Sequence, residues 1–156
     1  MAPVAYRLSS RVKVLLTVLL AVLATSTQAW AQGPGVRGGV SIDPDQFYFG
    51  GQVETAPLVD RLRFRPNLEL GVGSDATLAA FNFEFVYPFL SRQAWHAYAG
   101  AGPALNWFNI NDRSDTEAGF NMLVGLEHSR GLFFEVKLGV FDSPDVKFGV
   151  GYTFSR

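Results

Sequence analysis

Few residues of this sequence could carry out catalysis. The 156 residues include two histidines and no cysteine, which excludes a thiol nucleophile, a thiolate metal site and a disulfide scaffold. His128 precedes Ser129, but adjacent residues of a β-strand point to opposite faces, so His128 is poorly placed to activate the serine hydroxyl. His96 has no second histidine at ligand spacing, and we expect it to form a hydrogen bond inside the fold. We therefore expect no catalytic residue, no cofactor and no enzymatic activity.

A short acidic segment is the one candidate for metal binding. Asp112, Asp115 and Glu117 lie close together, and hard divalent cations prefer carboxylate oxygens as ligands. Acidic residues are also common in turns, so an ordinary turn is the alternative. The sequence contains no phosphate-binding loop and no dinucleotide-binding fingerprint. Its net charge of −1 argues against nucleic acid as a partner.

Residues 1–31 predict a secretory signal peptide. Three basic residues between positions 7 and 13 precede an apolar run from Val14 to Ala24, and Ala29-Trp30-Ala31 is a small-x-small cleavage site. Thr27-Gln28-Ala29 is a second candidate cleavage site. The apolar run is about a dozen residues, too short to span a bilayer comfortably, although an uncleaved anchor helix is the alternative. Cleavage before Gln32 would leave one domain, residues 32–156, with a net charge of −4.

The rest of the chain alternates between apolar and polar residues with a period of two, which is typical of β-strands. From Ala79 to Phe89, for example, every second residue is Ala, Phe or Tyr, whereas Asn82 and Glu84 lie on the other face. Turn-forming residues separate such runs, one of these turns being expected at Ser91-Arg92. The pattern predicts eight strands, at residues 36–42, 47–54, 62–73, 77–88, 94–107, 117–128, 132–141 and 146–154.

Two prolines fall inside these predicted strands. Pro66 lies in the segment 62–73, and Pro103 lies in the segment 94–107. Because proline has no N–H to donate to a neighbouring strand, we expect a bulge or a strand end near each of them.

The two faces of the strands differ in bulk and in charge. One face carries Phe, Tyr, Trp, Leu and Val, and the other carries charged, amide and glycine residues. The interior of an eight-stranded barrel is just wide enough for side chains, so the glycine-rich polar face fits inside and the bulky apolar face does not. An unpaired buried charge is costly, and the polar face balances five basic residues with five acidic ones. We expect these ten to form a charge network in the interior: Arg37, Arg63, Arg65, Lys137 and Lys147 with Glu54, Glu69, Glu84, Glu127 and Glu135.

Aromatic residues gather near both ends of the predicted strands. One set comprises Phe64, Tyr87, Phe89, Trp95, Phe134, Tyr152 and Phe154, and the other comprises Phe47, Phe49, Trp107 and Phe120. Two aromatic girdles are typical of strands that cross a bilayer. The sequence therefore predicts an all-β fold, an eight-stranded antiparallel up-and-down transmembrane β-barrel that follows a signal peptide.

This combination resembles the small outer-membrane β-barrels of the OmpA/OmpX-like family. The similarity covers the whole of residues 32–156 and rests on the strand pattern and the alternating last strand, Val146 to Phe154. It implies a location in the cell outer membrane, in contact with membrane lipid and lipopolysaccharide. It also implies that outer-membrane assembly machinery recognises the last strand, which ends near Phe154, although Ser155 and Arg156 follow that residue and displace the match. In this family both termini face the periplasm, which would give this chain an acidic outer rim and a basic periplasmic rim.

These features favour a non-enzymatic outer-membrane barrel with a side-chain-filled polar interior and a structural or surface-contact role. One alternative is a lipid-modifying enzyme similar to the outer-membrane lipid A deacylases, but their His-x-Ser-Asn pattern is absent here, where the order is His128-Ser129-Arg130. The other is a soluble periplasmic barrel that binds an apolar ligand. This last alternative requires the apolar face to point inward.

Overall fold

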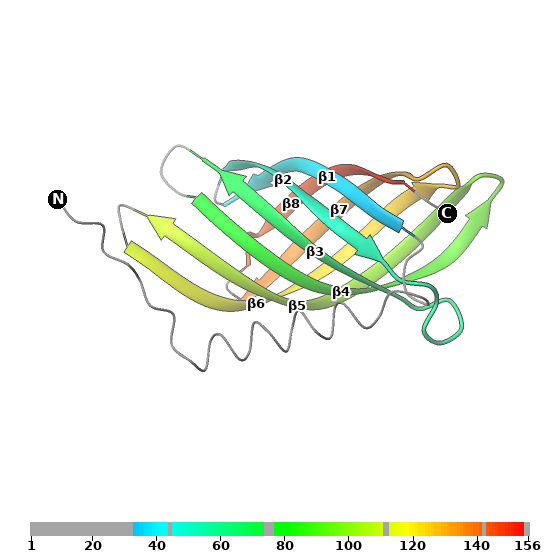
Figure 1. The fold of residues 1–156 in the computed structure, drawn as a ribbon, viewed down its shortest axis with the longest axis horizontal. Coiled ribbons are helices and arrows are strands. Elements are labelled where there is room, and N and C mark those ends of the chain that lie inside the picture. The colour runs from blue at the N-terminus through cyan, green and yellow to red at the C-terminus, as the bar shows by residue number, and fades with distance from the viewer. Residues whose placement is uncertain (1–32, 44, 74–76, 111–112, 142, 155–156) are drawn as a thin grey trace, which may run out of the picture. The chain divides into compact units, whose positions relative to one another are not determined.

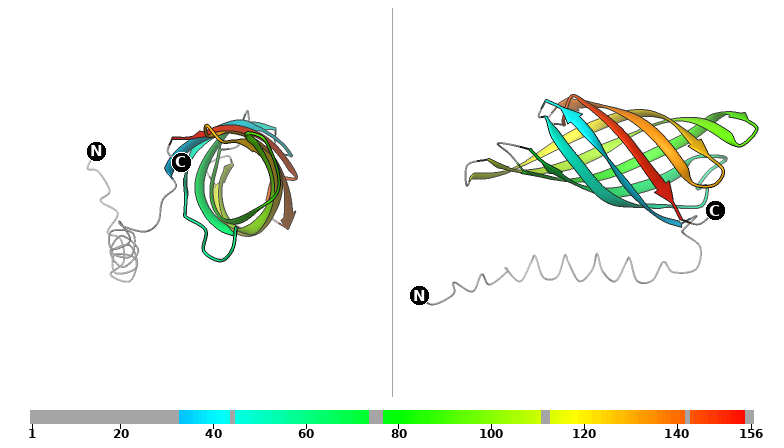
Figure 2. Two further views of the ribbon diagram at one scale, coloured as in Figure 1. Left: turned by 90° about the vertical axis from the view of Figure 1, so that its right-hand side faces the viewer. Right: turned by 90° about the horizontal axis from the view of Figure 1, so that it is seen from above.

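Eight β-strands form a closed antiparallel barrel in the computed structural model of the chain (Figure 1). The structure describes residues 33–43, 45–73, 77–110, 113–141 and 143–154. The strands are β1 (Gly33–Ile42), β2 (Gln46–Glu54), β3 (Arg63–Val72), β4 (Thr77–Arg92), β5 (Trp95–Ile110), β6 (Arg113–His128), β7 (Leu132–Phe141) and β8 (Val146–Thr153). Each strand pairs with the next in the sequence, and β1 pairs with β8 to close the ring seen in Figure 2. The predicted eight-stranded up-and-down barrel is confirmed.

The barrel has two ends that differ in their connections. At the terminus end, β1 begins and β8 ends, and the connections 55–62, 93–94 and 129–131 lie at this end. At the far end lie the connections that follow Ile42, Val72, Ile110 and Phe141. The predicted signal peptide, residues 1–31, lies outside the described residues and stays a prediction. Within the described ranges, no helix has the length and hydropathy needed to cross a bilayer.

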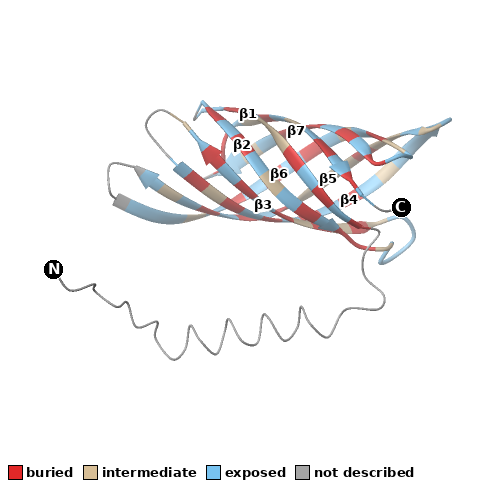
Figure 3. Cartoon of the chain, turned by 45° about the horizontal axis from the view of Figure 1, so that its top comes forward, coloured by how far each residue is buried: buried red, intermediate tan, exposed pale blue. Residues whose placement is uncertain are grey.

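Burial alternates along each strand, as the banding in Figure 3 shows. In β4, Asn82, Glu84 and Val86 are buried, whereas the residues between them are exposed. The exposed side chains are apolar in the middle of the wall: Phe83 is 40% exposed, Val124 56% and Val150 45%. The apolar face therefore points outward, as predicted. A barrel that holds an apolar ligand in an apolar interior is contradicted.

The middle strands are longer than the sequence pattern predicted. The turn expected at Ser91-Arg92 is wrong, because β4 continues through both residues and the turn lies at Gln93 and Ala94. Ser91 pairs with His96 and Arg92 pairs with Trp95, so the two strands remain paired after the apolar residues of β4 have ended. β5 and β6 likewise extend to Ile110 and from Arg113. Polar residues at these strand ends resemble turn residues in the sequence, but they continue a hairpin beyond the apolar part of the wall.

A bulge or a strand end was expected near Pro66 and near Pro103, and no bulge lies at either residue. Pro66 pairs with Phe83 in an unbroken register between β3 and β4. On the other side of Phe83, the β4–β5 pairing skips Phe83 and Glu84, opposite Pro103 and Gly102, and resumes in the same register. Beside Pro103 the wall omits paired positions rather than inserting a residue, and the pairing between β2 and β3 ends at Asn67, the residue after Pro66. Within the described pairings, the register shifts between Pro88 and Leu90 instead, and Phe89 is the extra residue.

Candidate functional site

The polar interior of the barrel is the candidate functional site. The structure places all ten predicted charged residues on the inner face, and each of them exposes 5% of its surface or less. Side chains from β1, β2, β3, β4, β6, β7 and β8 contribute, so the site exists only when the sheet is closed.

The first group of ion pairs lies toward the terminus end. Arg63 pairs with Glu54 and with Glu127, both at 2.7 Å. Arg65 pairs with the same two carboxylates, at 2.6 Å and 3.3 Å. Two guanidinium groups from β3 therefore bind one carboxylate from β2 and one from β6. Such charge-assisted hydrogen bonds are stronger than neutral ones and fix side-chain orientation.

The second group fills the middle of the barrel. Glu69 lies between Arg37 at 3.1 Å, Lys137 at 2.8 Å and Lys147 at 2.8 Å. Lys137 also lies 2.6 Å from Glu84, and Arg37 also pairs with Glu135. Arg65 joins the two groups through an ion pair of 3.2 Å with Glu135. Each buried charge in this group has an opposite charge nearby, which offsets part of the cost of removing it from water.

Two aromatic rings complete the charged interior. The guanidinium carbon of Arg65 lies 4.7 Å from the ring centroid of Tyr98 and 5.4 Å from that of Phe133. The Tyr98 hydroxyl donates a hydrogen bond of 2.8 Å to Glu135. A cation between two ring faces is stabilised by the negative charge of the π systems. The rings need space, which Gly125 provides beside Tyr98 and Gly151 provides beside Phe133.

A chain of amides also lines the interior, on the same strands as several of the charged residues. Asn121 donates to Asn82 at 2.7 Å, Asn82 donates to Asn67 at 2.7 Å, and Asn67 donates to Glu84 at 2.8 Å. Nearer the far end, Asn106 donates to the buried Ser143 hydroxyl at 3.2 Å. The polar interior is therefore hydrogen-bonded well beyond its charged residues.

The aromatic and amide residues of this site were not among the residues predicted from the sequence. Tyr98, Phe133 and the asparagines all lie on the inner face by the same alternation that marks the charged residues. Alternation along each strand was enough to predict that these residues face inward. Tyr98 and Phe133 were missed because aromatic residues were expected on the outer face.

The two histidines lie in different surroundings at the terminus end. His96 Nδ1 forms a hydrogen bond of 2.8 Å with the Ser91 hydroxyl at the rim of the barrel. His128 accepts a hydrogen bond of 3.1 Å from the backbone N–H of Arg130, and its ring lies edge-on to Trp95 at 4.9 Å. Both contacts are those of ordinary strand-end residues.

The predicted metal site is only partly described. Asp112 lies outside the described residues. Asp115 is exposed on β6, and its carboxylate accepts a hydrogen bond of 2.8 Å from the N–H of Thr116. Glu117 is half-buried on the same strand. Across the ranges that the structure describes, no group of three or more metal-ligating side chains is close enough to hold an ion.

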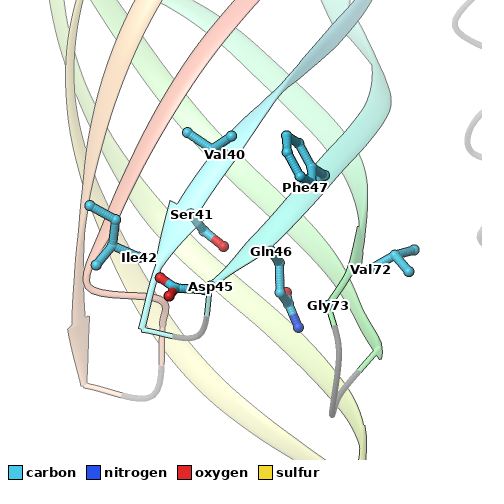
Figure 4. Close-up of a pocket in the computed structure, with 8 residues that line it drawn as sticks. All are labelled: Val40, Ser41, Ile42, Asp45, Gln46, Phe47, Val72 and Gly73. Carbon is cyan, nitrogen blue, oxygen red and sulfur yellow. The ribbon is translucent and has the colours of Figure 1, made fainter.

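A hollow of about 600 Å³ lies at the far end of the barrel, beside the β1–β2 hairpin (Figure 4). Its lining combines the apolar side chains of Val40, Phe47 and Val72 with the polar groups of Asp45 and Gln46. All of these residues lie at or just beyond the far ends of β1, β2 and β3. The hollow therefore lies at the rim of the barrel, and none of the ten charged interior residues lines it.

Comparison with known proteins identifies the fold. The sequence matches no protein-family model and no curated protein sequence. The structure is similar to that of the N-terminal β-barrel domain of Pseudomonas aeruginosa OprF, with a TM-score of 0.57 and 17% identity over 80% of this chain and 99% of that chain. It is also similar to Neisserial surface protein A, NspA, with a TM-score of 0.54 and 15% identity over 78% of this chain and 94% of that chain. At these levels of identity the similarity shows a shared fold, which in this chain is a closed antiparallel β-barrel.

Proposed function

We propose that this protein is an exported outer-membrane β-barrel with a structural or surface-contact role, without an open pore and without enzymatic activity. One observation carries the proposal: the closed barrel is apolar on its outer face and ion-paired on its inner face. Soluble monomers rarely expose large continuous apolar surfaces, because water contact with such a surface is unfavourable. Lipid around the barrel would remove that cost. The inner face needs no contact with lipid or bulk water, because its charged groups pair with one another.

The outer surface has the features of a membrane-spanning wall. A tilted strand needs about 9–11 residues to cross a bilayer, and the strands here have 8 to 16. Aromatic pairs lie toward the terminus end, with ring centroids 6.3 Å apart for Trp95 and Phe134 and 5.5 Å apart for Tyr152 and Phe154. Amphipathic aromatic rings favour the boundary between lipid and water.

The interior supports the absence of a pore. Arg65 and Lys137 are 0% and 1% exposed, and the ion pairs around them reach from β3 across to β7. Water and ions could pass only if several of these contacts separated together. The balanced pairs instead support a role in holding the wall together.

Export and assembly form part of the same proposal. Residues 1–31 would direct the chain out of the cytoplasm and be removed before Gln32. The outer-membrane assembly machinery would recognise β8 and the aromatic residue after it, and Phe154 is 60% exposed with its N–H bonded to the Pro34 carbonyl at 2.8 Å. In the membrane the wall would contact phospholipid on the periplasmic side and lipopolysaccharide on the outer side, with both termini in the periplasm.

Cell fractionation and electrophoresis test the proposal. We expect the mature protein to begin at Gln32 by mass spectrometry and to be found in the outer-membrane fraction. In SDS without heating, a folded barrel keeps its shape, so its mobility should differ from that of the boiled sample. A protein found in the soluble periplasmic fraction, with the same mobility before and after boiling, would contradict the proposal.

A further inference from the structure

An apolar hollow lies on the outer wall, toward the terminus end. It has a volume of about 520 Å³ and is lined by residues of β5 to β8, with Phe89 of β4 at its edge. Its floor is only half-exposed and is formed by small residues, among them Ala97, Gly125 and Gly149. The exposed side chains of Leu126 and Phe134 also line it. An indentation bounded by bulky apolar side chains has the chemistry and size to hold part of a hydrocarbon chain.

A basic lip borders this hollow at the terminus end. The turns 93–94 and 129–131 are joined by a hydrogen bond of 2.7 Å from the Ser129 N–H to the Ala94 carbonyl. Arg92 and Arg130, both exposed, lie within two residues of this bond. The segments 91–96 and 128–131 contain no Asp or Glu. Trp95 connects the lip to the hollow, since its ring stacks 6.3 Å from that of Phe134.

We propose that the hollow and its lip form a binding site for an anionic phospholipid of the periplasmic leaflet. An acyl chain would lie over Ala97 and Gly125, and the phosphate would bind Arg92 and Arg130. Guanidinium groups bind phosphate through paired hydrogen bonds, and two of them on a lip whose own segments contain no Asp or Glu favour a headgroup that carries net negative charge. The inference rests on the proposed membrane location and on the placement of both termini in the periplasm.

The opposite end of the barrel has the opposite charge. Its exposed side chains include Asp43, Asp45, Asp115 and Asp145. A phosphate near these carboxylates would be repelled, so charge complementarity places the phospholipid at the terminus end.

Native mass spectrometry of the full protein, released from detergent with phosphatidylglycerol or phosphatidylcholine of the same acyl chains, tests the site. We expect about fivefold or greater preference for phosphatidylglycerol, since a basic residue near an anionic lipid contributes roughly that factor. The double variant Arg92→Gln/Arg130→Gln should reduce binding of phosphatidylglycerol to the level of phosphatidylcholine. Ala97→Leu should reduce binding of both lipids, because the larger side chain fills the hollow.

Two matched variants serve as controls. Arg61→Gln removes an arginine from the connection 55–62, and Ala101→Leu enlarges an outward residue of β5 that does not line the hollow. Both should bind phosphatidylglycerol as the unaltered protein does. Equal binding of the two lipids, or equal losses in the control and test variants, would overturn the site. Heat-dependent mobility is measured on every variant: its absence from the unaltered protein would refute the membrane barrel itself, whereas its presence without lipid preference would refute only this site.

Discussion

At the scale of single residues, glycine determines which side chains the interior can hold. Tyr98 and Phe133 are bulky, yet they lie inside a narrow barrel because Gly125 and Gly151 face them. A methyl group on either glycine would overlap the facing ring. The aromatic rings and the glycines are therefore complementary parts of one packed layer around Arg65.

The first prediction concerns Gly151. Gly151→Ala should lower the free energy of unfolding by about 1–3 kcal/mol, because the added carbon would overlap both the Phe133 ring and the Val36 carbonyl oxygen. Urea unfolding of the protein in lipid or detergent measures this change. Gly51→Ala is the matched control, since the nearest atom to its added carbon would be 3.8 Å away, at ordinary contact distance. Adding Phe133→Leu to Gly151→Ala should restore part of the loss, and equal effects of the two alanine variants would contradict the packing described.

The second prediction concerns Arg65, which pairs with Glu54, Glu127 and Glu135. Arg65→Met should cost about 3–5 kcal/mol of unfolding free energy, because it leaves buried carboxylates with fewer positive partners. Adding Glu54→Gln should recover part of this loss by removing one of those negative charges. The exposed Arg61 provides the comparison, since Arg61→Met should change stability by less than about 0.5 kcal/mol. If Arg65→Met were as mild as Arg61→Met, the interior network would contribute little to stability.

At the scale of the strand, much of the fold could be predicted from the sequence. Each step along a strand reverses the face, so one correctly placed residue such as Phe83 determines the orientation of its neighbours until the register changes. That register does change at Phe89, and nothing in the local sequence distinguishes Pro88, beside the bulge, from Pro66, where the pairing continues. Whether proline disturbs a wall depends on its cross-strand partners, which lie far away in the sequence.

The sequence was enough to predict which charged residues face the interior, but it could not predict which of them contact one another. Alternation indicated that Arg65 and Glu135 face inward, and the structure shows them as partners on β3 and β7, 70 residues apart in the sequence. Their meeting depends on the tilt and stagger of all the strands between them. A hydropathy pattern reports the face of a residue and contains no information on that stagger.

The third prediction tests the outer face of one strand. Val124 and Thr116 both point outward on β6, but Val124 lies among apolar neighbours and Thr116 lies near the far end. Val124→Arg should make folding into bilayers less favourable by about 2–4 kcal/mol, because it places a charge in the hydrocarbon region. Thr116→Arg should cost less than about 1 kcal/mol, as expected near or beyond the lipid boundary. Similar losses for both variants, measured by folding into lipid vesicles, would be inconsistent with a membrane-facing wall.

At the scale of the whole molecule, the barrel is closed around its circumference and filled along its axis. Ion pairs, two aromatic rings and a chain of amides occupy the interior. We therefore expect the wall to be stable in lipid without a water-filled passage, as the proposed function requires.

The fourth prediction is that the barrel does not conduct as a porin does. In planar bilayers we expect no stable open level of porin size, since eight strands enclose little space and buried charged side chains occupy it. Arg65→Met, tested in parallel, should still lack such a level because Tyr98 and Phe133 remain. Reproducible large steps from the unaltered protein, with purity verified by mass spectrometry, would contradict the filled interior.

The ion pair between Arg37 of β1 and Glu135 of β7 has a consequence for the order of events during biogenesis. These two strands become near neighbours only when β8 docks against β1 at the seam. A sheet inserted into lipid before that moment would present charged side chains to hydrocarbon, at a cost of several kcal/mol for each unpaired group. We therefore expect the seam to close before or together with entry into the membrane, and we expect the barrel to cross its folding barrier as one cooperative unit without a stable half-inserted sheet.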